Sequence, residues 1–183
     1  MQSVYDASSF SECAILLHNG RLFDFLLPDA SVIDIELVAH ALSNLCRFTG
    51  HTREYYSVAQ HSVLVSSLLP TDLAFAGLLH DAGEALIGDV SKPLQAIVSG
   101  YKPVKERVEK AVFEHFGIPW PLPKAVKRAD RAALLFEMRD LFGYDDRMLE
   151  EFSEEFQVEP IRPMQPKEAR QAFLRRYSEL GGA

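Results

Sequence analysis

The sequence predicts an all-α protein with a short N-terminal β-hairpin. Apolar residues recur at helical spacing through most of the chain, proline and glycine separate these periodic segments, and only one region near the start carries a hairpin signal. With 183 residues, 48% of them hydrophobic, the chain is long enough for one well-cored domain. We therefore expect a single domain over residues 1–183, with its helical core at about residues 34–141.

The N-terminal hairpin is expected over about residues 14–26. Asn19 and Gly20 stand between two apolar-rich segments. Both turn positions of a tight hairpin need positive φ, which these two residue types adopt readily. The pair Asn19-Gly20 therefore predicts a β-hairpin before the first helix.

Helical periodicity begins after Pro28. A first helix is expected from near Asp34 to around residues 47–50, and a second from Ser57, which is a good N-cap. His61 shares the apolar face of the second helix. The apolar stripes of the two helices consist of Ile35, Val38, Leu42 and Leu45, and of Val58, Val65 and Leu69.

The segment LAFAGLLHDAGEAL belongs to a third helix that opens at Pro70 and Thr71. It is apolar nearly all round, which is typical of a central, buried helix. Gly88 and Pro93 break the pattern, so GDVSKPLQ is expected to form a turn that leaves this helix.

Further helices are expected in the second half of the chain. One covers residues 104–116 and is closed by Gly117, and another begins at Pro123 and carries Asp130. The charged stretch GYDDRMLEEFSEEF is expected to hold a loop and a short helix, and a last helix covers about residues 166–180. The residues at helical spacing from Asp130 are Val126, Ala133 and Glu137.

The composition narrows the class of protein. A formal net charge of −7 argues against long nucleic acid as a partner, because phosphate neutralisation needs a basic face. The N-terminus lacks a targeting signal and no apolar run approaches the roughly 20 residues that span a bilayer, so we expect a cytoplasmic protein without a membrane segment. The acidic helical surface is compatible with a homodimer or a larger homo-oligomer. Cys13 and Cys46 are expected to be buried free thiols.

The segment LLHDAGEALIGD places several ionisable residues in an apolar setting. An isolated buried charge is disfavoured by several kcal/mol, so buried His and Asp must be paired or must bind a metal. On a helix, His80 and Asp81 diverge by about 100° and can hold one ion from that side. His61 and Asp130 are the candidates for further ligands, since their apolar neighbours direct both toward the core.

Two histidines and two aspartates suit a divalent ion such as manganese, cobalt, iron, zinc or magnesium, with positions left for water and substrate. Such an ion lowers the pKa of a bound water and polarises a phosphoryl oxygen. Each residue alone also has an ordinary explanation. A lone histidine on an apolar face is often a hydrogen-bonded core residue, and Asp130, between Arg128 and Arg131, can form a surface ion pair. Only the ordered combination indicates a metal site.

In order and local context these residues resemble the HD-domain metal-dependent phosphohydrolases, whose pattern is a His, a His-Asp pair and a distant Asp on separate helices. VAQHS, LLHDAGE and KRAD carry the pattern here. Together with RF at 47–48 and HDAGEALIGDVSKP, they are similar to small bacterial 5′-deoxynucleotidases and phage dATP triphosphohydrolases over roughly residues 15–140. The resemblance implies an HD-domain helical fold, a divalent metal ion, and hydrolysis of (deoxy)nucleotide 5′-phosphates by a metal-activated water.

The resemblance also implies roles for individual residues. Glu84 matches the acidic residue that orients or activates the water, and Asp89 matches a carboxylate near the sugar hydroxyl or the leaving oxygen; without the resemblance, Asp89 is a turn residue. Arg47 matches a phosphate-binding arginine, because a guanidinium binds phosphate oxygens bidentately, although a surface salt bridge is an equal alternative. Phe48 replaces a tryptophan that lies against the sugar, which leaves the choice between deoxyribose and ribose open. Two further candidates, for polyphosphate contacts, are His51 and Lys92.

Three functions are compatible with the sequence. The first is a nucleotide phosphohydrolase that releases phosphate from a monophosphate or triphosphate from a triphosphate. The second is a non-catalytic HD module that senses nucleotides, which the presence of Glu84 disfavours because a binding module needs no water activator. The third is a di-iron HD-fold oxygenase, which needs additional histidine ligands. The histidines left for that purpose, none in a helical pair with the known ligands, are His18, His40, His51 and His115.

Overall fold

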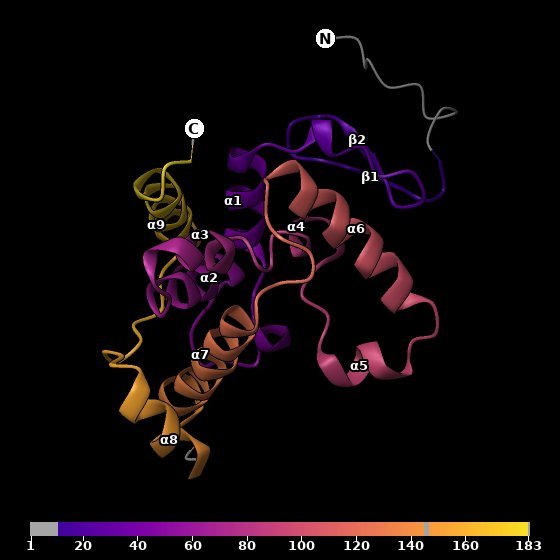
Figure 1. Cartoon of the computed structure of the whole chain (residues 1–183). Coiled ribbons are helices and arrows are strands. Elements are labelled where there is room, and N and C mark those ends of the chain that lie inside the picture. The colour runs from indigo at the N-terminus through magenta and orange to yellow at the C-terminus, as the bar shows by residue number, and fades with distance from the viewer. Residues whose placement is uncertain (1–10, 145–146, 183) are drawn as a thin grey trace.

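The computed structural model of the protein describes residues 11–144 and 147–182 (Figure 1). Within these ranges the chain forms nine α-helices and one two-stranded antiparallel hairpin, which confirms the predicted fold class. None of the described helices is both long and apolar enough to cross a bilayer. The elements are β1 (Ala14–Leu16), β2 (Leu22–Asp24), α1 (Ile35–Asn44), α2 (Val58–Ser67), α3 (Thr71–Leu78), α4 (Glu84–Ile87), α5 (Lys92–Ile97), α6 (Tyr101–His115), α7 (Lys124–Phe142), α8 (Arg147–Glu155) and α9 (Pro166–Glu179).

The hairpin lies within the predicted range. Ile15 of β1 pairs with Phe23 of β2, and Gly20 in the connecting turn has a φ of 79°. The expectation of positive φ at both turn positions is wrong for Asn19, because five residues connect the strands and the turn is not a tight two-residue one. Phe23 is completely buried, so the hairpin packs onto the helices instead of standing free.

Polar residues start α1 and α2 at the predicted places. The side chain of Asp34 accepts a hydrogen bond of 2.7 Å from the backbone N–H of Leu37, and that of Ser57 accepts one of 3.1 Å from Gln60. Each bond satisfies a backbone donor that has no partner inside the helix.

Helix α1 ends before residues 47–50, where the sequence predicted its end. The backbone leaves the helix because Cys46 forms an isolated β-bridge with Ser57, and this bridge carries Arg47 to the wall of a cavity. Cys46 and Cys13 are free, but both are partly exposed because they lie on loop segments. The prediction that these thiols are buried is therefore wrong.

The segment predicted as one central helix is broken. Helix α3 ends at Leu78, and residues 79–83 form turns with i→i+3 hydrogen bonds before α4 begins at Glu84. His80 and Asp81 therefore lie on turns. The expected divergence of their side chains is wrong, since His80 Nε2 lies 3.1 Å from Asp81 Oδ2. The tighter turn geometry aims successive side chains differently from an α-helix.

The other helix boundaries differ less. Lys92 begins α5 inside the segment predicted as a turn, because Pro93 is tolerated in the first turn of a helix. Helix α6 begins at Tyr101, before the first residue of its apolar stripe, and Pro123 is the N-cap of α7 and not its first residue. Helices α8 and α9 lie in the predicted segments.

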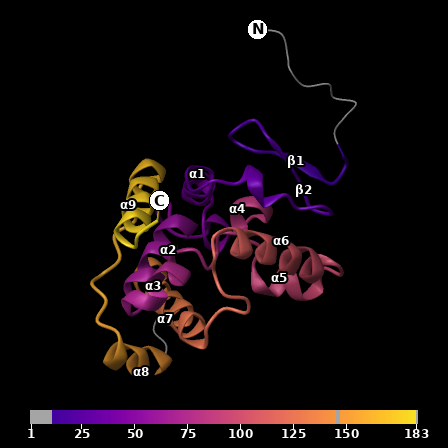
Figure 2. The same ribbon diagram turned by 45° about the horizontal axis from the view of Figure 1, so that its top comes forward.

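One apolar core joins the hairpin to the helices. Helix α2 contacts α1, α3, α7 and α9, and a smaller cluster joins α7 to α8. Both views place α5 and α6 on the side of the molecule opposite α9 (Figures 1 and 2). The main core includes Phe23, Val38, Leu78, Val112 and Phe173, all fully buried.

Two glycines allow helices to approach closely around the turns that carry His80 and Asp81. A Cβ on Gly77 would lie 3.3 Å from Cα of Ser66 on α2, and a Cβ on Gly83 would lie 3.1 Å from Cγ of Glu109 on α6. Both contacts are tighter than ordinary van der Waals packing. The absence of side chains here therefore lets α2 lie against α3, and α6 against the turn at Gly83.

Substitution of Gly77 by valine is expected to lower the free energy of unfolding by about 1–3 kcal/mol, because the added carbons overpack the α2–α3 contact. The gain in helix propensity over glycine, about 0.5 kcal/mol, is too small to offset this. Urea denaturation followed by circular dichroism measures the change. Ala125→Val, at an exposed position of α7, is the control and should change stability by less than about 0.5 kcal/mol; equal effects of the two variants would contradict the packing argument.

Candidate metal centre

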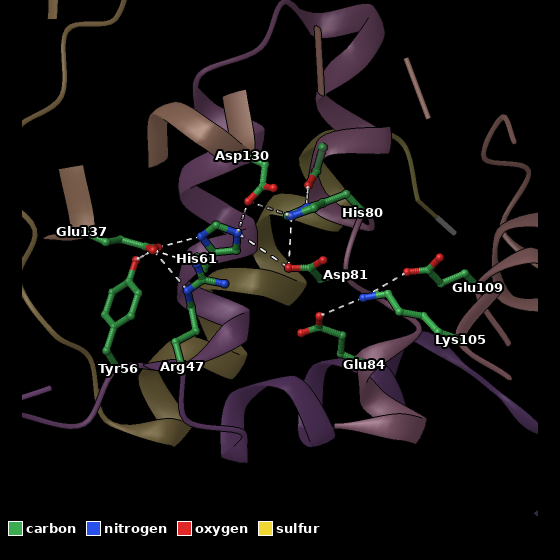
Figure 3. Close-up of polar contacts among 11 residues, drawn as sticks. Arg47, Tyr56, His61, His80, Asp81, Glu84, Lys105, Glu109, Asp130 and Glu137 are labelled. Atoms are coloured by element: carbon green, nitrogen blue, oxygen red, sulfur yellow. Dashed lines mark hydrogen bonds and ion pairs between the residues drawn. The ribbon is translucent and has the colours of Figure 1, made fainter. Parts of the chain in front are cut away.

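Four side chains from three elements meet in one cluster (Figure 3). His61 comes from α2, Asp130 from α7, and His80 and Asp81 from the turns between α3 and α4. His61 Nε2 lies 3.2 Å from Asp130 Oδ1 and 3.6 Å from Asp81 Oδ2. His80 Nε2 lies 3.1 Å from Asp81 Oδ2 and 3.8 Å from Asp130 Oδ1. Residues far apart in the sequence are thus direct neighbours in space.

The spacing of these atoms fits a single cation. One ligand atom from each of His61, His80 and Asp130 lies within 4.8 Å of the other two. Around an ion with bonds of about 2.0–2.2 Å, neighbouring ligand atoms are roughly 3 Å apart, so small side-chain adjustments close the gaps. These three residues could hold a metal ion, and Asp81 lies beside them.

Hydrogen bonds to the Nδ1 atoms orient both imidazoles. His80 Nδ1 lies 2.7 Å from the carbonyl oxygen of Gly77, and His61 Nδ1 lies 2.6 Å from Oε1 of Glu137. A carbonyl and a carboxylate only accept, so each Nδ1 carries the proton and donates. The two buried Nε2 atoms face the oxygens of Asp130 and Asp81, and among the described residues neither makes a hydrogen bond of good geometry. A buried nitrogen with a free lone pair is what a metal ligand requires.

The neighbouring carboxylates raise the pKa of both histidines. Burial acts to lower the pKa of His80, but Asp81 and Asp130 outweigh it, so the pKa lies well above its ordinary value. Burial and Arg47 act to lower the pKa of His61, and the carboxylates of Glu137 and Asp130 again raise it above 6.5. The carboxylates therefore favour the protonated form of both rings in the absence of a metal, so that a proton and a metal ion compete for Nε2.

The aspartates show the opposite shift. Burial acts to raise the pKa of Asp81, but His80 and His61 hold it far below the ordinary range. Burial also opposes ionisation of Asp130, and its contacts with the same two imidazoles likewise leave its pKa far below the ordinary range. Both carboxylates are therefore ionised and available as anionic ligands at neutral pH.

A cavity of about 1050 Å³ opens beside this cluster. His80, Asp81 and Asp130 form part of its wall, and Phe48, Trp120 and Leu122 contribute apolar surface. Six basic and six acidic side chains line it, so its formal charge is zero although the chain carries −7. The basic residues are Arg47, Lys92, Lys102, Lys105, Lys127 and Arg131, and the acidic residues are Asp81, Glu84, Asp89, Glu106, Glu109 and Asp130.

Glu84 lies in the same cavity, at the start of α4. Its Oε1 is 3.7 Å from Nζ of Lys105, and that Nζ is also 3.4 Å from Oε1 of Glu109 (Figure 3). Its Oε2 is buried without a hydrogen-bond partner. Burial, with the nearby charges of Asp81 and Asp89, raises the pKa of Glu84 well above its ordinary value. Glu84 therefore binds a proton more readily than an exposed glutamate does.

Arg47 is held from inside the protein. Its Nη2 and Nε donate hydrogen bonds of 2.8 and 3.1 Å to Oε2 of Glu137, and its guanidinium carbon lies 5.2 Å from the centre of the Phe48 ring. The Phe48 ring in turn packs edge-on against Phe142, with 5.0 Å between the ring centres. Arg47 and Phe48 both line the cavity. The salt bridge of Arg47 is thus buried and does not lie on the surface.

The remaining predicted residues differ in position. Asp89 lines the cavity, and burial raises its pKa although Arg47 opposes the shift. Lys92 is exposed and lines the cavity from the first turn of α5. His51 is exposed and is not among the lining residues, so its contact with a polyphosphate stays a prediction without geometric support.

Three residues of the site were not predicted from the sequence. Glu137 is fully buried two turns after Asp130, and its only sequence signal was helical spacing from that residue. Tyr56, whose hydroxyl donates to Glu137 over 3.0 Å, immediately precedes an N-cap. Lys105 reaches Glu84 only because α6 packs against the turn at Gly83, and nothing in its local sequence indicates this.

Two known proteins are similar to this chain over most of its length. No family model matches the sequence. The uncharacterized protein YfdR of Escherichia coli (strain K12) is 38% identical over 165 residues, covering 88% of this chain and 92% of that protein. An uncharacterized protein of Rhodobacter capsulatus is 34% identical over 181 residues, with the same two coverages. Neither description assigns an activity.

Metal affinity is expected to fall as the pH is lowered. Both histidines have a pKa raised above 6.5 in the metal-free cluster, so protons still compete for Nε2 at pH values at which ordinary histidine is neutral. Affinity for Mn²⁺ or Co²⁺ should therefore continue to rise above pH 6.5, by up to roughly tenfold per pH unit for each proton released. Calorimetric titration across this range measures the dependence.

Two alanine variants, one at a proposed ligand and one control, test whether the cluster is the metal site. His80→Ala removes a facing nitrogen and should weaken metal binding by more than about 100-fold. His115→Ala removes a histidine that packs on Phe116 and does not line the cavity, and it should bind metal like the unmodified protein. If His80→Ala kept full affinity, the cluster would not be the metal site.

Proposed function

The chain belongs to the family of the Escherichia coli protein YfdR, and we propose that it is a metal-dependent phosphohydrolase acting on (deoxy)nucleotide 5′-phosphates. One observation carries the proposal. Two buried, unpartnered histidine nitrogens and two ionised aspartates converge beside a large cavity that also contains Arg47 and Glu84. In this proposal Asp81 is the fourth ligand, next to His61, His80 and Asp130.

The protein side chains divide the work of hydrolysis. A bound divalent ion supplies a Lewis acid that polarises the phosphoryl group and makes water more acidic. Arg47 is directed at the cavity by Glu137 and binds phosphate oxygens through its remaining N–H groups. Glu84 accepts a proton from the attacking water at Oε2, which is buried and has no other partner.

Asp89 completes the pair of carboxylates. In this proposal it lies near the leaving oxygen and donates a proton to it, a role favoured by the burial that raises its pKa.

The cavity favours a nucleotide over a small phosphate ester. Its volume of about 1050 Å³ accommodates a base, a sugar and phosphates. Trp120 is 44% exposed, lines the cavity and is braced by Phe113, with 5.8 Å between the ring centres. An aromatic surface of this kind stacks on a planar base. The lysines of the wall suit the phosphates of either a monophosphate or a triphosphate.

The two other functions receive less support. A sensing module has no use for a buried Glu84 carboxylate beside the proposed metal ligands, with Oε2 free of any hydrogen bond to the described residues. A di-iron oxygenase needs more histidines near the cluster, yet His18 stacks on His40 at 3.7 Å, and neither they nor His115 line the cavity. Phosphohydrolysis uses every polar group of the cluster.

A panel of nucleotides is expected to identify a substrate. The protein with Mn²⁺ or Co²⁺ should convert either a monophosphate to nucleoside and phosphate, or a triphosphate to nucleoside and triphosphate, and chromatography separates these products. Deoxyribonucleotides and ribonucleotides of each base are compared, because Phe48 does not predict which of the two sugars is bound. If no member of the panel were cleaved by protein with bound metal, the proposal would fail.

Glu84→Gln is expected to lower kcat by about 100- to 10,000-fold, because the amide cannot accept the proton of the attacking water. Metal affinity should change little, since Glu84 is not among the proposed ligands. Glu106→Gln is the matched control: it lies in the same cavity wall, with a side chain that is 52% exposed and paired with Lys102. Full turnover by Glu84→Gln at saturating metal would remove Glu84 from the mechanism.

A further inference from the structure

The fully buried carboxylate of Glu137 serves two halves of the site. Its Oε1 lies 2.6 Å from Nδ1 of His61 and accepts a hydrogen bond of 3.0 Å from the hydroxyl of Tyr56. Its Oε2 accepts both hydrogen bonds from Arg47. One oxygen therefore faces the metal cluster and the other faces the proposed phosphate-binding residue (Figure 3).

The bond to His61 determines which nitrogen is offered to a metal. A carboxylate cannot donate, so Nδ1 of His61 must carry the proton, and the lone pair of the neutral ring is on Nε2. Nε2 is the atom that lies 3.2 Å from Asp130 and has no hydrogen-bond partner of its own. An acceptor at Nδ1 also increases the basicity of the ring, which strengthens a metal bond at Nε2.

The bond to Arg47 determines where its guanidinium points. Two of its five N–H groups donate to Glu137, and its side chain is only 11% exposed. Because the guanidinium is planar, fixing one edge directs the opposite edge. Arg47 lines the cavity, so its opposite edge is the one that an anion in the cavity would meet.

We propose that Glu137 is a positioning residue that orients His61 for the metal and Arg47 for a phosphate oxygen at the same time. The Arg47 half of this inference rests on the proposed function, whereas the His61 half concerns metal binding alone. Each of the two groups has its own oxygen of the carboxylate, Oε1 for His61 and Oε2 for Arg47. A neutral amide in its place has one oxygen and satisfies only one of them.

The variant Glu137→Gln tests this arrangement, because His61 and Arg47 then compete for a single oxygen. Arg47 donates two charge-assisted hydrogen bonds against one from His61, so the amide oxygen should turn to Arg47. The amide N–H₂ then faces His61 Nδ1, which must accept, and the proton moves to Nε2, where it blocks the metal. Affinity for Co²⁺, measured by calorimetry without nucleotide, is expected to fall by about 10- to 100-fold.

A second substitution distinguishes positioning from general damage. In Glu137→Gln combined with Arg47→Met, the competing donors are absent, so the amide oxygen is free to accept from His61 Nδ1. Co²⁺ affinity should recover by about tenfold relative to Glu137→Gln alone. Arg47→Met alone should retain metal affinity. The control Glu109→Gln removes a carboxylate from the cavity wall that does not contact His61, and it should also retain metal affinity.

Three results would overturn the proposal: undiminished Co²⁺ affinity in Glu137→Gln, no recovery in the double variant, or the same loss in Glu109→Gln. A measurement on the unmodified protein tests the proposal even if the variants fail to fold. With Zn²⁺ bound, the proton NMR spectrum should contain a low-field, slowly exchanging His61 Nδ1–H resonance, since the hydrogen bond is short and buried. A rapidly exchanging proton would also overturn the proposal. None of these readouts involves turnover, so absence of nucleotide hydrolysis would reject the proposed function and leave this test intact.

Discussion

Burial of charge inside a helical core is the constraint on which this structure depends. His61 and Glu137 are completely buried, and His80 is only 5% exposed. Isolated ions in such places would cost several kcal/mol each, so the carboxylates must lie against imidazoles or a guanidinium. The partners come from α2, α7 and the turns after α3. The buried charges are therefore paired only when these elements pack against one another. Close approach at Gly77 and Gly83 is part of this packing.

The same constraint bears on the proposed binding of a phosphate by an acidic chain. The formal charge of the cavity wall is zero, against −7 for the whole chain, and a divalent cation in the cluster would make the local charge positive. Arg47 is the deepest cation of the wall, and its own counter-charge, Glu137, lies on the side away from solvent. A phosphate group would therefore meet the arginine without displacing an ion pair at the surface.

Local backbone strain lies at the same place. Phe48 and Thr49 have φ values of 54° and 55°, in the left-handed region that residues with a side chain rarely occupy. Both line the cavity directly after Arg47, and the Phe48 ring is packed between Arg47 and Phe142. The tertiary contacts of this segment stabilise a conformation that the isolated chain would avoid, which keeps an aromatic ring beside the proposed phosphate-binding residue.

The sequence by itself determined the helical fold class, the N-terminal hairpin with Gly20 in its turn, and the N-caps Asp34 and Ser57, because periodicity, turn preference and capping act over a few residues. It also predicted that His61, His80, Asp81 and Asp130 meet, since buried histidines and aspartates need partners. Only the tertiary structure decided how α3 breaks, which makes His80 and Asp81 converge instead of diverge. The roles of Glu137 and Lys105 were likewise decided by packing. Their partners lie on other helices, and no local pattern records which distant groups a buried side chain will meet.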